Sequence, residues 1–199
     1  MDSEGAFTEK SFSRHDLERV QGIVDRAHRA LLFVGLLTRK LALKSRMQQP
    51  IVVGGGAVEV YTAGGYTSQD IDLVMLDSAP AERILADSGF AKEGRYWIHP
   101  DLDLLVEFPG STLTYGPEAY QRLFHAEVDG EFAWIIGIED ILIGRIWSGI
   151  SEKRDHDLQV AREMIALNRE SIDWAAAKLI AGMNGPETVA ALERLRNAP

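Results

Sequence analysis

The sequence predicts an α/β (α+β) protein in which a small mixed sheet is flanked by helices and followed by a helical C-terminal part. Short β-branched or alternating runs indicate strands, whereas apolar residues at three- and four-residue steps indicate helices before and after them. With 199 residues, 46% of them hydrophobic, the chain can bury one sizeable core, or a core with a small helical appendage. We therefore expect three parts: a flexible N-terminus (1–14), an α/β domain with a long N-terminal helix (15–136) and a helical C-terminal subdomain (137–199).

The N-terminal helix is predicted over residues 15–47, with a break near Gly35. Basic residues cluster at its end: Arg39, Lys40, Lys44 and Arg46. They fit a solvated face that complements a helix C-terminus, and a phosphate-binding role is the alternative. Residues 1–14 show no periodicity, so we expect them to be loose or to fold only against a partner.

Residues 51–75 carry the most informative pattern. A buried strand (51–53) leads into a triple-glycine turn at Gly54, Gly55 and Gly56, a short helix and a polar loop, and a second strand covers 70–75. Glycines let the backbone approach a ligand closely, and the start of a helix offers free N–H groups to anionic oxygens. Phosphate is therefore the natural ligand of this turn.

Two carboxylates follow the turn. In a strand, Asp70 and Asp72 project from the same face. Such a pair is costly unless a cation neutralises it, and oxygen ligands beside a phosphate suit Mg²⁺ better than zinc. The alternative is that these residues are solubilising charges on an edge strand.

A third carboxylate is predicted from the strand at residues 101–108, where alternation puts Asp101, Asp103 and Glu107 on one face. If this strand lies beside the first acidic strand, its acidic face can meet Asp70 and Asp72. Glu107 is favoured because Val106 and Phe108 flank it inside the strand. Asp103, on the same face, stays open as the alternative, and Asp101 fits a strand-entry residue.

The remaining elements have clearer boundaries. Ser78 and Pro80 predict the start of a helix that Gly89 closes. The Asp129–Gly130 turn precedes a short strand at 132–136. Helices are expected at about 138–147, 154–167, 172–183 and 187–196, separated by breaks rich in Ser, Asn, Gly and Pro.

The pair Gly55-Gly56, followed after thirteen residues by Asp70-Ile71-Asp72, resembles the signature of the nucleotidyltransferase superfamily related to DNA polymerase β. The wider text, GGGAVEVYTAGGYTSQDIDLV with RYWIHPDLDLLVEFP, is similar to small prokaryotic nucleotidyltransferase-like proteins of the abortive-infection, toxin type. The resemblance covers about residues 50–108 well and 137–158 weakly. It implies a nucleotidyltransferase-type sheet in the α/β domain.

The resemblance also implies an activity: transfer of NMP from an NTP to a hydroxyl of an acceptor, which is RNA, a protein or a small molecule, with Mg²⁺ or Mn²⁺ as cofactor. Its catalytic and metal-binding residues here are Asp70, Asp72 and Glu107, with Asp103 as the alternative metal ligand. Its nucleotide-binding residues here are Gly54, Gly55, Gly56, Arg145 and Asp157. Thr67 and Ser68, just ahead of Asp70, are further nucleotide-binding candidates because their hydroxyls can donate to a phosphate, and the alternative is that they only shape the turn. Arg145 stands where the relatives have lysine, and arginine binds phosphate but does not transfer protons.

Two other interpretations assume the same fold without catalytic activity. One is a catalytically inactive nucleotide- or partner-binding module, such as the antitoxin of a toxin–antitoxin pair. Another is a structural protein that assembles, for example as a homodimer, through its long N-terminal helix. Tyr66, Tyr96 and Trp97 can stack on a base, but such aromatics also fill cores.

Composition excludes other classes. A net charge of -9 argues against broad, nonspecific binding to nucleic acid or anionic membrane. The absence of cysteine excludes disulfides and thiol catalysis, and the scattered histidines lack the spacing of a zinc site. An acidic, polar N-terminus is unlike a secretory signal, and no apolar run is long enough to span a bilayer. We therefore expect a cytoplasmic protein.

Overall fold

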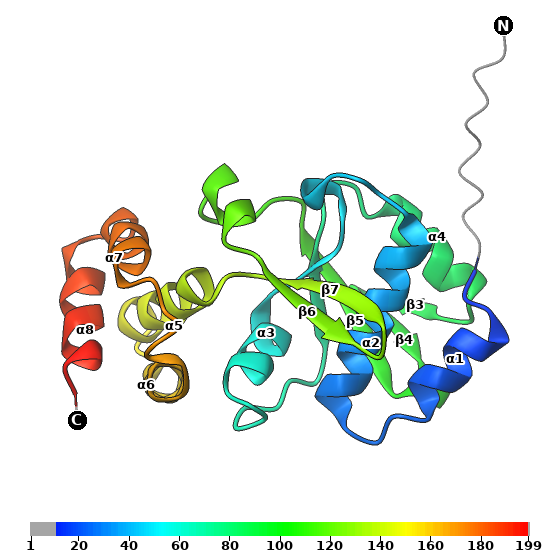
Figure 1. Cartoon of the computed structure of the whole chain (residues 1–199), viewed down its shortest axis with the longest axis horizontal. Coiled ribbons are helices and arrows are strands. Elements are labelled where there is room, and N and C mark those ends of the chain that lie inside the picture. The colour runs from blue at the N-terminus through cyan, green and yellow to red at the C-terminus, as the bar shows by residue number, and fades with distance from the viewer. Residues whose placement is uncertain (1–10, 199) are drawn as a thin grey trace, which may run out of the picture.

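The computed structural model describes residues 11–198 and shows an α/β fold built on one mixed sheet of seven strands, as expected from the sequence (Figure 1). The strands are β1 (Ile51–Val52), β2 (Ile71–Val74), β3 (Ala91–Glu93), β4 (Tyr96–His99), β5 (Leu104–Gly110), β6 (Phe124–Val128) and β7 (Glu131–Ile135). The helices are α1 (Arg14–Gln21), α2 (Arg26–Leu41), α3 (Gly54–Tyr61), α4 (Ala79–Asp87), α5 (Ile138–Ser151), α6 (Asp155–Asn168), α7 (Trp174–Met183) and α8 (Pro186–Arg196).

The sheet order is β3-β4-β5-β2-β1-β7-β6. Strand β2 lies at the centre, antiparallel to β1 and parallel to β5, and β1 is parallel to β7. Antiparallel hairpins close both edges, β3–β4 at one end and β6–β7 at the other. The two parallel pairs require crossover connections, which the helices supply.

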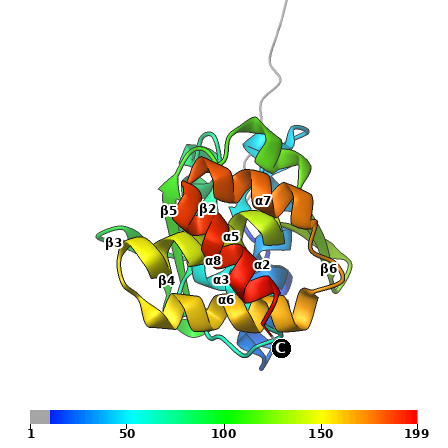
Figure 2. The ribbon, with the colours of Figure 1, turned by 90° about the vertical axis from the view of Figure 1, so that its left-hand side faces the viewer.

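Two hydrophobic cores hold the chain together. The larger one packs α1, α2 and α4 on the sheet, and the ring of Phe33 in α2 lies 5.6 Å from that of Phe12 and 5.5 Å from that of Phe90. The smaller one is formed by α5 to α8, with Val58 of α3 buried among them. Figure 2 shows these four C-terminal helices stacked as a layer in front of α3 and the sheet.

The expected single N-terminal helix is wrong: the chain forms α1 and α2 with a break at residues 22–25, not near Gly35. Asp25 begins α2 by accepting a hydrogen bond from the backbone N–H of His28, which explains the restart. Gly35 lies inside α2, where a Cβ atom would come within 2.7 Å of Glu131 Cβ. Glycine is present there because α2 packs closely on β7.

The strand expected at residues 101–108 begins later and has a partner that the sequence did not reveal. Pro100–Leu102 form a turn of 3₁₀ helix and Asp103 adopts a left-handed conformation, with φ of 51°. Strand β5 therefore starts at Leu104 and pairs antiparallel with β4. Asp101 and Asp103 precede the strand and do not share the alternation of Glu107.

Other boundaries lie close to those expected. Asp129 and Gly130 both have positive φ, which confirms the turn before β7, although its partner strand β6 was not expected. Residues 1–10 of the expected flexible N-terminus lie outside the described residues. Phe12 is buried, and Ser13 caps α1. Among residues 11–198, none of the helices combines the length and apolar character needed to cross a membrane.

Candidate active site

Three carboxylates meet on one face of the sheet. Strands β2 and β5 are parallel, and their register places Asp72 directly opposite Glu107. Asp70 lies in the bend just before β2 and presents its carboxylate to the same place. Carboxylate oxygens of Asp70, Asp72 and Glu107 lie within 4.8 Å of one another. Asp70 and Asp72 are partly buried and Glu107 is buried.

The electrostatics of this cluster are unfavourable without a cation. Burial, followed by the charges of Asp70 and Glu107, raises the pKa of Asp72 to about 6. The backbone N–H of Gly55, which donates a hydrogen bond to Asp72, and the charge of Arg95 oppose this shift. A set of three carboxylates with this spacing fits a hard divalent cation with oxygen ligands, such as Mg²⁺ or Mn²⁺.

A cationic side chain, that of Arg95, reaches the cluster. Arg95, in the turn between β3 and β4, places Nε 3.2 Å from Glu107 Oε2. Its guanidinium also lies 4.7 Å from the centre of the Tyr96 ring and donates a hydrogen bond to the Tyr96 hydroxyl. The Arg95 side chain is 67% exposed, so solvent screens this ion pair.

The three glycines expected as a turn before a helix instead form the first turn of α3 itself, and this glycine turn packs against the carboxylates. Gly54 has φ of 57°, and a Cβ atom there would lie 2.0 Å from Asp72 Oδ2. A Cβ atom at Gly55 would lie 2.4 Å from Ser68 Oγ. Only glycine fits these two positions, because side chains would displace Asp72 and Ser68. Gly56, by contrast, faces Val52 of the sheet.

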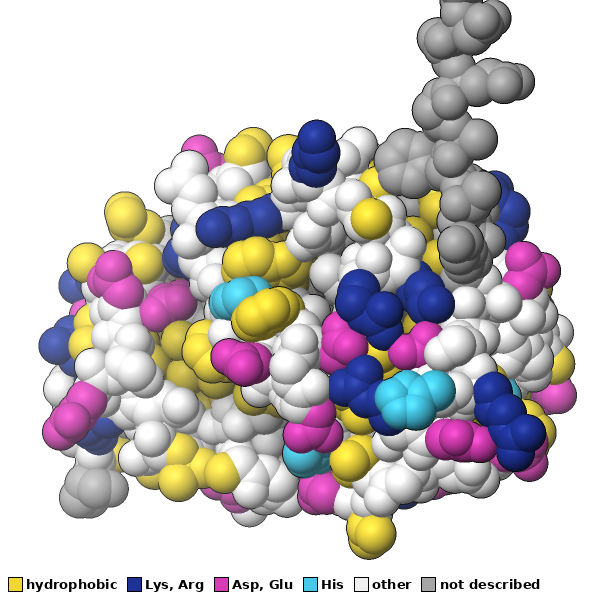
Figure 3. Space-filling model, turned by 45° about the vertical axis from the view of Figure 1, so that its right-hand side comes forward, with side chains coloured by type: hydrophobic (Ala, Val, Ile, Leu, Met, Phe, Trp, Pro, Cys, Tyr) yellow, Lys and Arg dark blue, Asp and Glu magenta, His cyan; other side chains and the backbone are white. Residues whose placement is uncertain are grey.

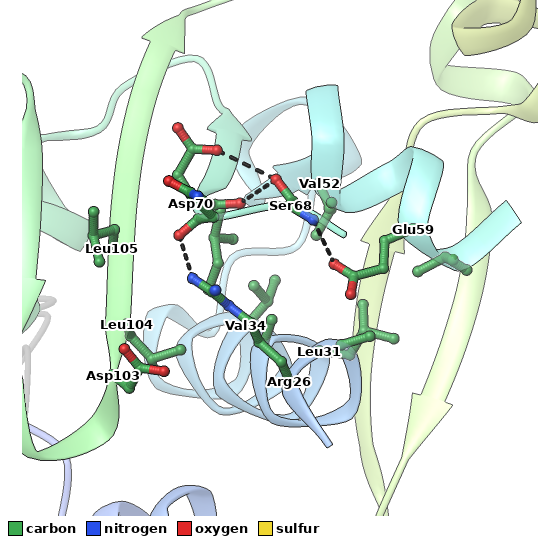
Figure 4. A pocket seen from close by; sticks show the side chains of 16 residues that line it. Arg26, Leu31, Val34, Val52, Glu59, Ser68, Asp70, Asp103, Leu104 and Leu105 are labelled. Atoms are coloured by element: carbon green, nitrogen blue, oxygen red, sulfur yellow. Dashed lines mark hydrogen bonds between the residues drawn. The ribbon is translucent and has the colours of Figure 1, made fainter. Parts of the chain in front are cut away.

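Ser68 holds Asp70 in place (Figure 4). Its hydroxyl lies 3.0 Å from the Asp70 backbone oxygen and 3.3 Å from Asp70 Oδ1, and its backbone N–H donates to the buried carboxylate of Glu59. Ser68 is therefore a neighbour of the cluster that orients one of its carboxylates. Thr67 lines a different pocket, together with Arg26 and Glu59, between α2 and α3.

Asp103 is not a member of the cluster. It lies at the wall of a small, largely apolar pocket between α2 and the sheet, where Figure 4 shows it next to Leu104 and apart from Asp70. Its side chain is 73% exposed and lies 3.7 Å from Arg29 Nη1. The geometry therefore brings Glu107, and not Asp103, to Asp70 and Asp72.

A cleft of about 720 Å³ begins at the glycine turn. Helix α3 contributes Gly54 and strand β2 contributes Val74. The loop after β5 contributes Tyr115, and α5 contributes Gly144 and Trp147. Trp147 is 42% exposed, an unusual state for so large an apolar side chain. The volume is sufficient for a nucleotide, since ligand pockets commonly measure about 300–1,000 Å³.

Arg145 and Asp157 form an ion pair of 2.8 Å between α5 and α6, and Ser148 Oγ donates to the other oxygen of Asp157 at 2.8 Å. Burial alone would raise the pKa of Asp157, but these two hydrogen bonds lower it. The Arg145 guanidinium lies 5.6 Å from the centre of the Tyr66 ring, which in turn lies near Gly55. The side chain of Tyr66 therefore lies between this ion pair and the glycine turn.

Sequence reasoning missed Arg95 and Trp147. Reading Glu93-Gly94-Arg95-Tyr96 as a two-residue hairpin turn would have placed Arg95 beside the strand that carries Glu107. Trp147 follows the helical pattern of α5 and gave no separate signal. Of the aromatics considered for base stacking, Trp97 is buried and Tyr96 lies directly opposite Glu107.

Comparisons with known proteins agree with this architecture. No family model and no curated protein matches the sequence. A crystal structure of an antigenic nucleotidyltransferase-like protein from Paracoccidioides brasiliensis matches 92% of this chain and 95% of that chain, with a TM-score of 0.50 and 18% sequence identity. At this identity the likeness shows the fold alone. The chain has a nucleotidyltransferase-like fold.

Proposed function

We propose that the protein is a Mg²⁺- or Mn²⁺-dependent nucleotidyltransferase that transfers NMP from an NTP to a hydroxyl of an acceptor. The observation that carries this proposal is the convergence of Asp70, Asp72 and Glu107, with oxygens within 4.8 Å, beside the glycine turn that opens the cleft. The nucleotidyltransferase-like fold supports it. A group of carboxylates alone would be weak support, because acidic clusters are common on protein surfaces.

In this reaction a bond forms between the acceptor oxygen and the α-phosphorus, the bond to the β-phosphate breaks, and pyrophosphate leaves. Asp70, Asp72 and Glu107 would hold the divalent ion. When bound, the ion supplies neutralisation of the triphosphate charge and lowers the pKa of the acceptor hydroxyl. Glu107 accepts the proton that this hydroxyl releases.

The other residues bind and orient the nucleotide. The turn at Gly54 and Gly55 lets the triphosphate approach the backbone, and Ser68 acts by orienting Asp70 rather than by binding phosphate. Arg145 and Asp157 support the wall behind the turn through Tyr66. Thr67 has no part in this proposal because it lines the pocket between α2 and α3.

The subtype and acceptor rest on the sequence resemblance described above. We infer a cytoplasmic enzyme of the abortive-infection, toxin type, with RNA, protein or a small molecule as the acceptor. Incubation with labelled NTPs and cell extract, followed by separate nuclease and protease treatment, assigns the label to one of these classes.

Calorimetric titration with Mg²⁺ and each NTP tests the proposal directly. We expect the wild type to bind at least one NTP in the presence of Mg²⁺. The combined substitutions Asp70→Asn and Asp72→Asn should abolish ion-dependent binding while the circular dichroism spectrum is unchanged. Equal NTP affinity in this variant and the wild type would rule out the proposed site.

The alternative is an inactive nucleotide- or partner-binding module on the same fold. The ion pair between Arg95 and Glu107 favours it, because it engages the third carboxylate. Nucleotide binding without any labelled product, across all NTPs and extract fractions, would support this alternative.

A further inference from the structure

The hairpin β3–β4 places the guanidinium of Arg95 beside the carboxylate cluster. Glu93 pairs with Tyr96, which leaves Gly94 and Arg95 as a two-residue turn. Tyr96 in turn pairs with Glu107 on β5. The turn therefore places Arg95 next to Glu107, where Nε and Oε2 lie 3.2 Å apart.

The ion pair between Arg95 and Glu107 can be broken easily. Arg95 is 67% exposed, and the distance of 3.2 Å to Glu107 is long for an ion pair. The turn has open space beside it, since a Cβ atom at Gly94 would have no neighbour within 4 Å and β3 is exposed along its length. Tyr96 offers the guanidinium a second partner through its ring and hydroxyl.

A second arginine–carboxylate pair in the chain shows the contrast. Arg122 donates two hydrogen bonds to Asp140, at 2.6 and 2.7 Å, and the Asp140 side chain is 0% exposed. Such a bidentate, buried pair is strong and fixed in geometry. The pair formed by Arg95 has neither property.

We propose that Arg95 is a displaceable internal cation that competes with the divalent ion for Glu107, so that ion binding requires its guanidinium to leave. This inference rests on the proposed function. Three negative charges lie in the cluster, and the guanidinium acts electrostatically on Asp70 and Asp72 as well as on Glu107. A divalent ion and Arg95 therefore draw on the same carboxylates, and each weakens the binding of the other.

The test is the affinity for Mn²⁺ alone, measured as free ion by electron paramagnetic resonance, for the wild type and three full-length variants. Arg95→Gln removes the charge. Arg95→Lys keeps the charge but not the planar contact. Arg14→Gln is the matched control, since Arg14 is an exposed arginine that pairs with Glu18 on α1 and its loss changes the net charge equally. Circular dichroism checks that each variant folds.

We expect Arg95→Gln to bind Mn²⁺ about three- to ten-fold more tightly than the wild type, the range set by an exposed ion pair together with relieved charge repulsion. The Mn²⁺ affinities of Arg95→Lys and Arg14→Gln should stay within about two-fold of the wild type. Arg95→Lys keeps a cation beside Glu107, and Arg14→Gln leaves the carboxylate cluster undisturbed. Unchanged or weaker binding in Arg95→Gln overturns the competition, and so does equal tightening in Arg14→Gln or Arg95→Lys. Failure of every protein to bind Mn²⁺ overturns the proposed function and this inference with it.

Discussion

Two groups of acidic residues, one buried and one partly buried, have opposite electrostatic environments. Asp16 and Glu131, both buried, share cations from α1 and α2: Arg39 contacts Asp16 at 2.7 Å and Glu131 at 3.0 Å, Arg19 contacts Glu131 at 2.9 Å and Lys40 contacts Asp16 at 3.3 Å. Figure 3 shows basic and acidic side chains intermixed in this way on one face of the molecule. The carboxylates of Asp70, Asp72 and Glu107 have one exposed arginine among them.

The pKa values record this difference. Burial alone would raise the pKa of Asp16, but hydrogen bonds from Ser13, Lys40 and Arg39 hold it far below the ordinary value. The pKa of Asp72 rises to about 6, through burial and then repulsion. The charges of Asp16 and Glu131 are balanced by cations of the fold itself. The cluster of Asp70, Asp72 and Glu107 has more negative than positive charge, which is the expected state of a site that binds a cation.

The largest expected effect separates the two candidates for the third carboxylate. Glu107→Gln should weaken Mn²⁺ binding by about 100-fold or more, because it removes a charged ligand. Asp103→Asn should change it by less than about two-fold, since an exposed charge outside the cluster is screened. Titration of both variants with Mn²⁺ makes the comparison, and a larger effect in Asp103→Asn would reverse the assignment.

The next largest expected effect is a loss of stability when the group formed by Asp16 and Glu131 is disrupted. Asp16→Ala should lower the free energy of unfolding by about 2–3 kcal/mol, because it removes the capping-box partner of Ser13 at the start of α1 and leaves Arg39 and Lys40 without one partner. Since the folded pKa of Asp16 lies below its unfolded value of 3.8, this contribution is present above that pH and is lost as pH falls. Denaturant unfolding at pH 7 and pH 3 checks both statements. An equal difference at the two pH values would contradict them.

The glycine turn offers a matched pair of substitutions. Gly54→Ala should weaken Mn²⁺ binding by about ten-fold, because the added methyl group meets Asp72 at 2.0 Å. Gly64 also has positive φ, 82°, but no atom lies within 4 Å of a Cβ atom there. Gly64→Ala should therefore cost about 1 kcal/mol of stability from backbone strain and leave ion affinity unchanged. Equal ion affinities in the two variants would show that the turn does not support Asp72.

The smallest effect concerns Asp72 in the absence of metal. Its folded pKa of about 6 exceeds the unfolded value of 3.8, so the folded state binds the proton more tightly and stability falls as pH rises between these values. Asp72→Asn should therefore stabilise the EDTA-treated protein by about 1 kcal/mol at pH 8, after discounting for partial exposure, and by nothing at pH 4. Destabilisation at pH 8 would mean that the cluster is not under repulsion.

Local patterns predicted much of this fold. The glycine turn, the alternation around Asp70 and Asp72, and the periodicity of α5 to α8 each depend on neighbours in sequence, and their elements lie close to the predicted positions. The break between α1 and α2 could have been read from Asp25, a good N-cap. The break predicted at Gly35 was wrong because that glycine serves a contact with β7, which only the tertiary structure reveals.

The candidate site was predictable to the extent that it lies in strands. Glu107 was favoured because of its flanking apolar residues, but choosing between it and Asp103 requires the register of β2 with β5, a long-range property. Strand β3 has three residues and is wholly exposed, and β6 has only Ala126 fully buried, so neither has a hydrophobic alternation that a sequence pattern could show. Arg95 was missed for this reason.

The parallel pairing of β2 with β5 has a consequence for how the site comes into being. Asp72 and Glu107 are neighbours in space only after α4 and the β3–β4 hairpin have crossed between them. An ion held by all three carboxylates binds only the folded chain. Its binding therefore stabilises the folded crossover connection relative to the unfolded state. A nascent chain still lacking β5 has two of the three ligands, so the complete ligand set exists only after β5 has been synthesised and has paired with β2.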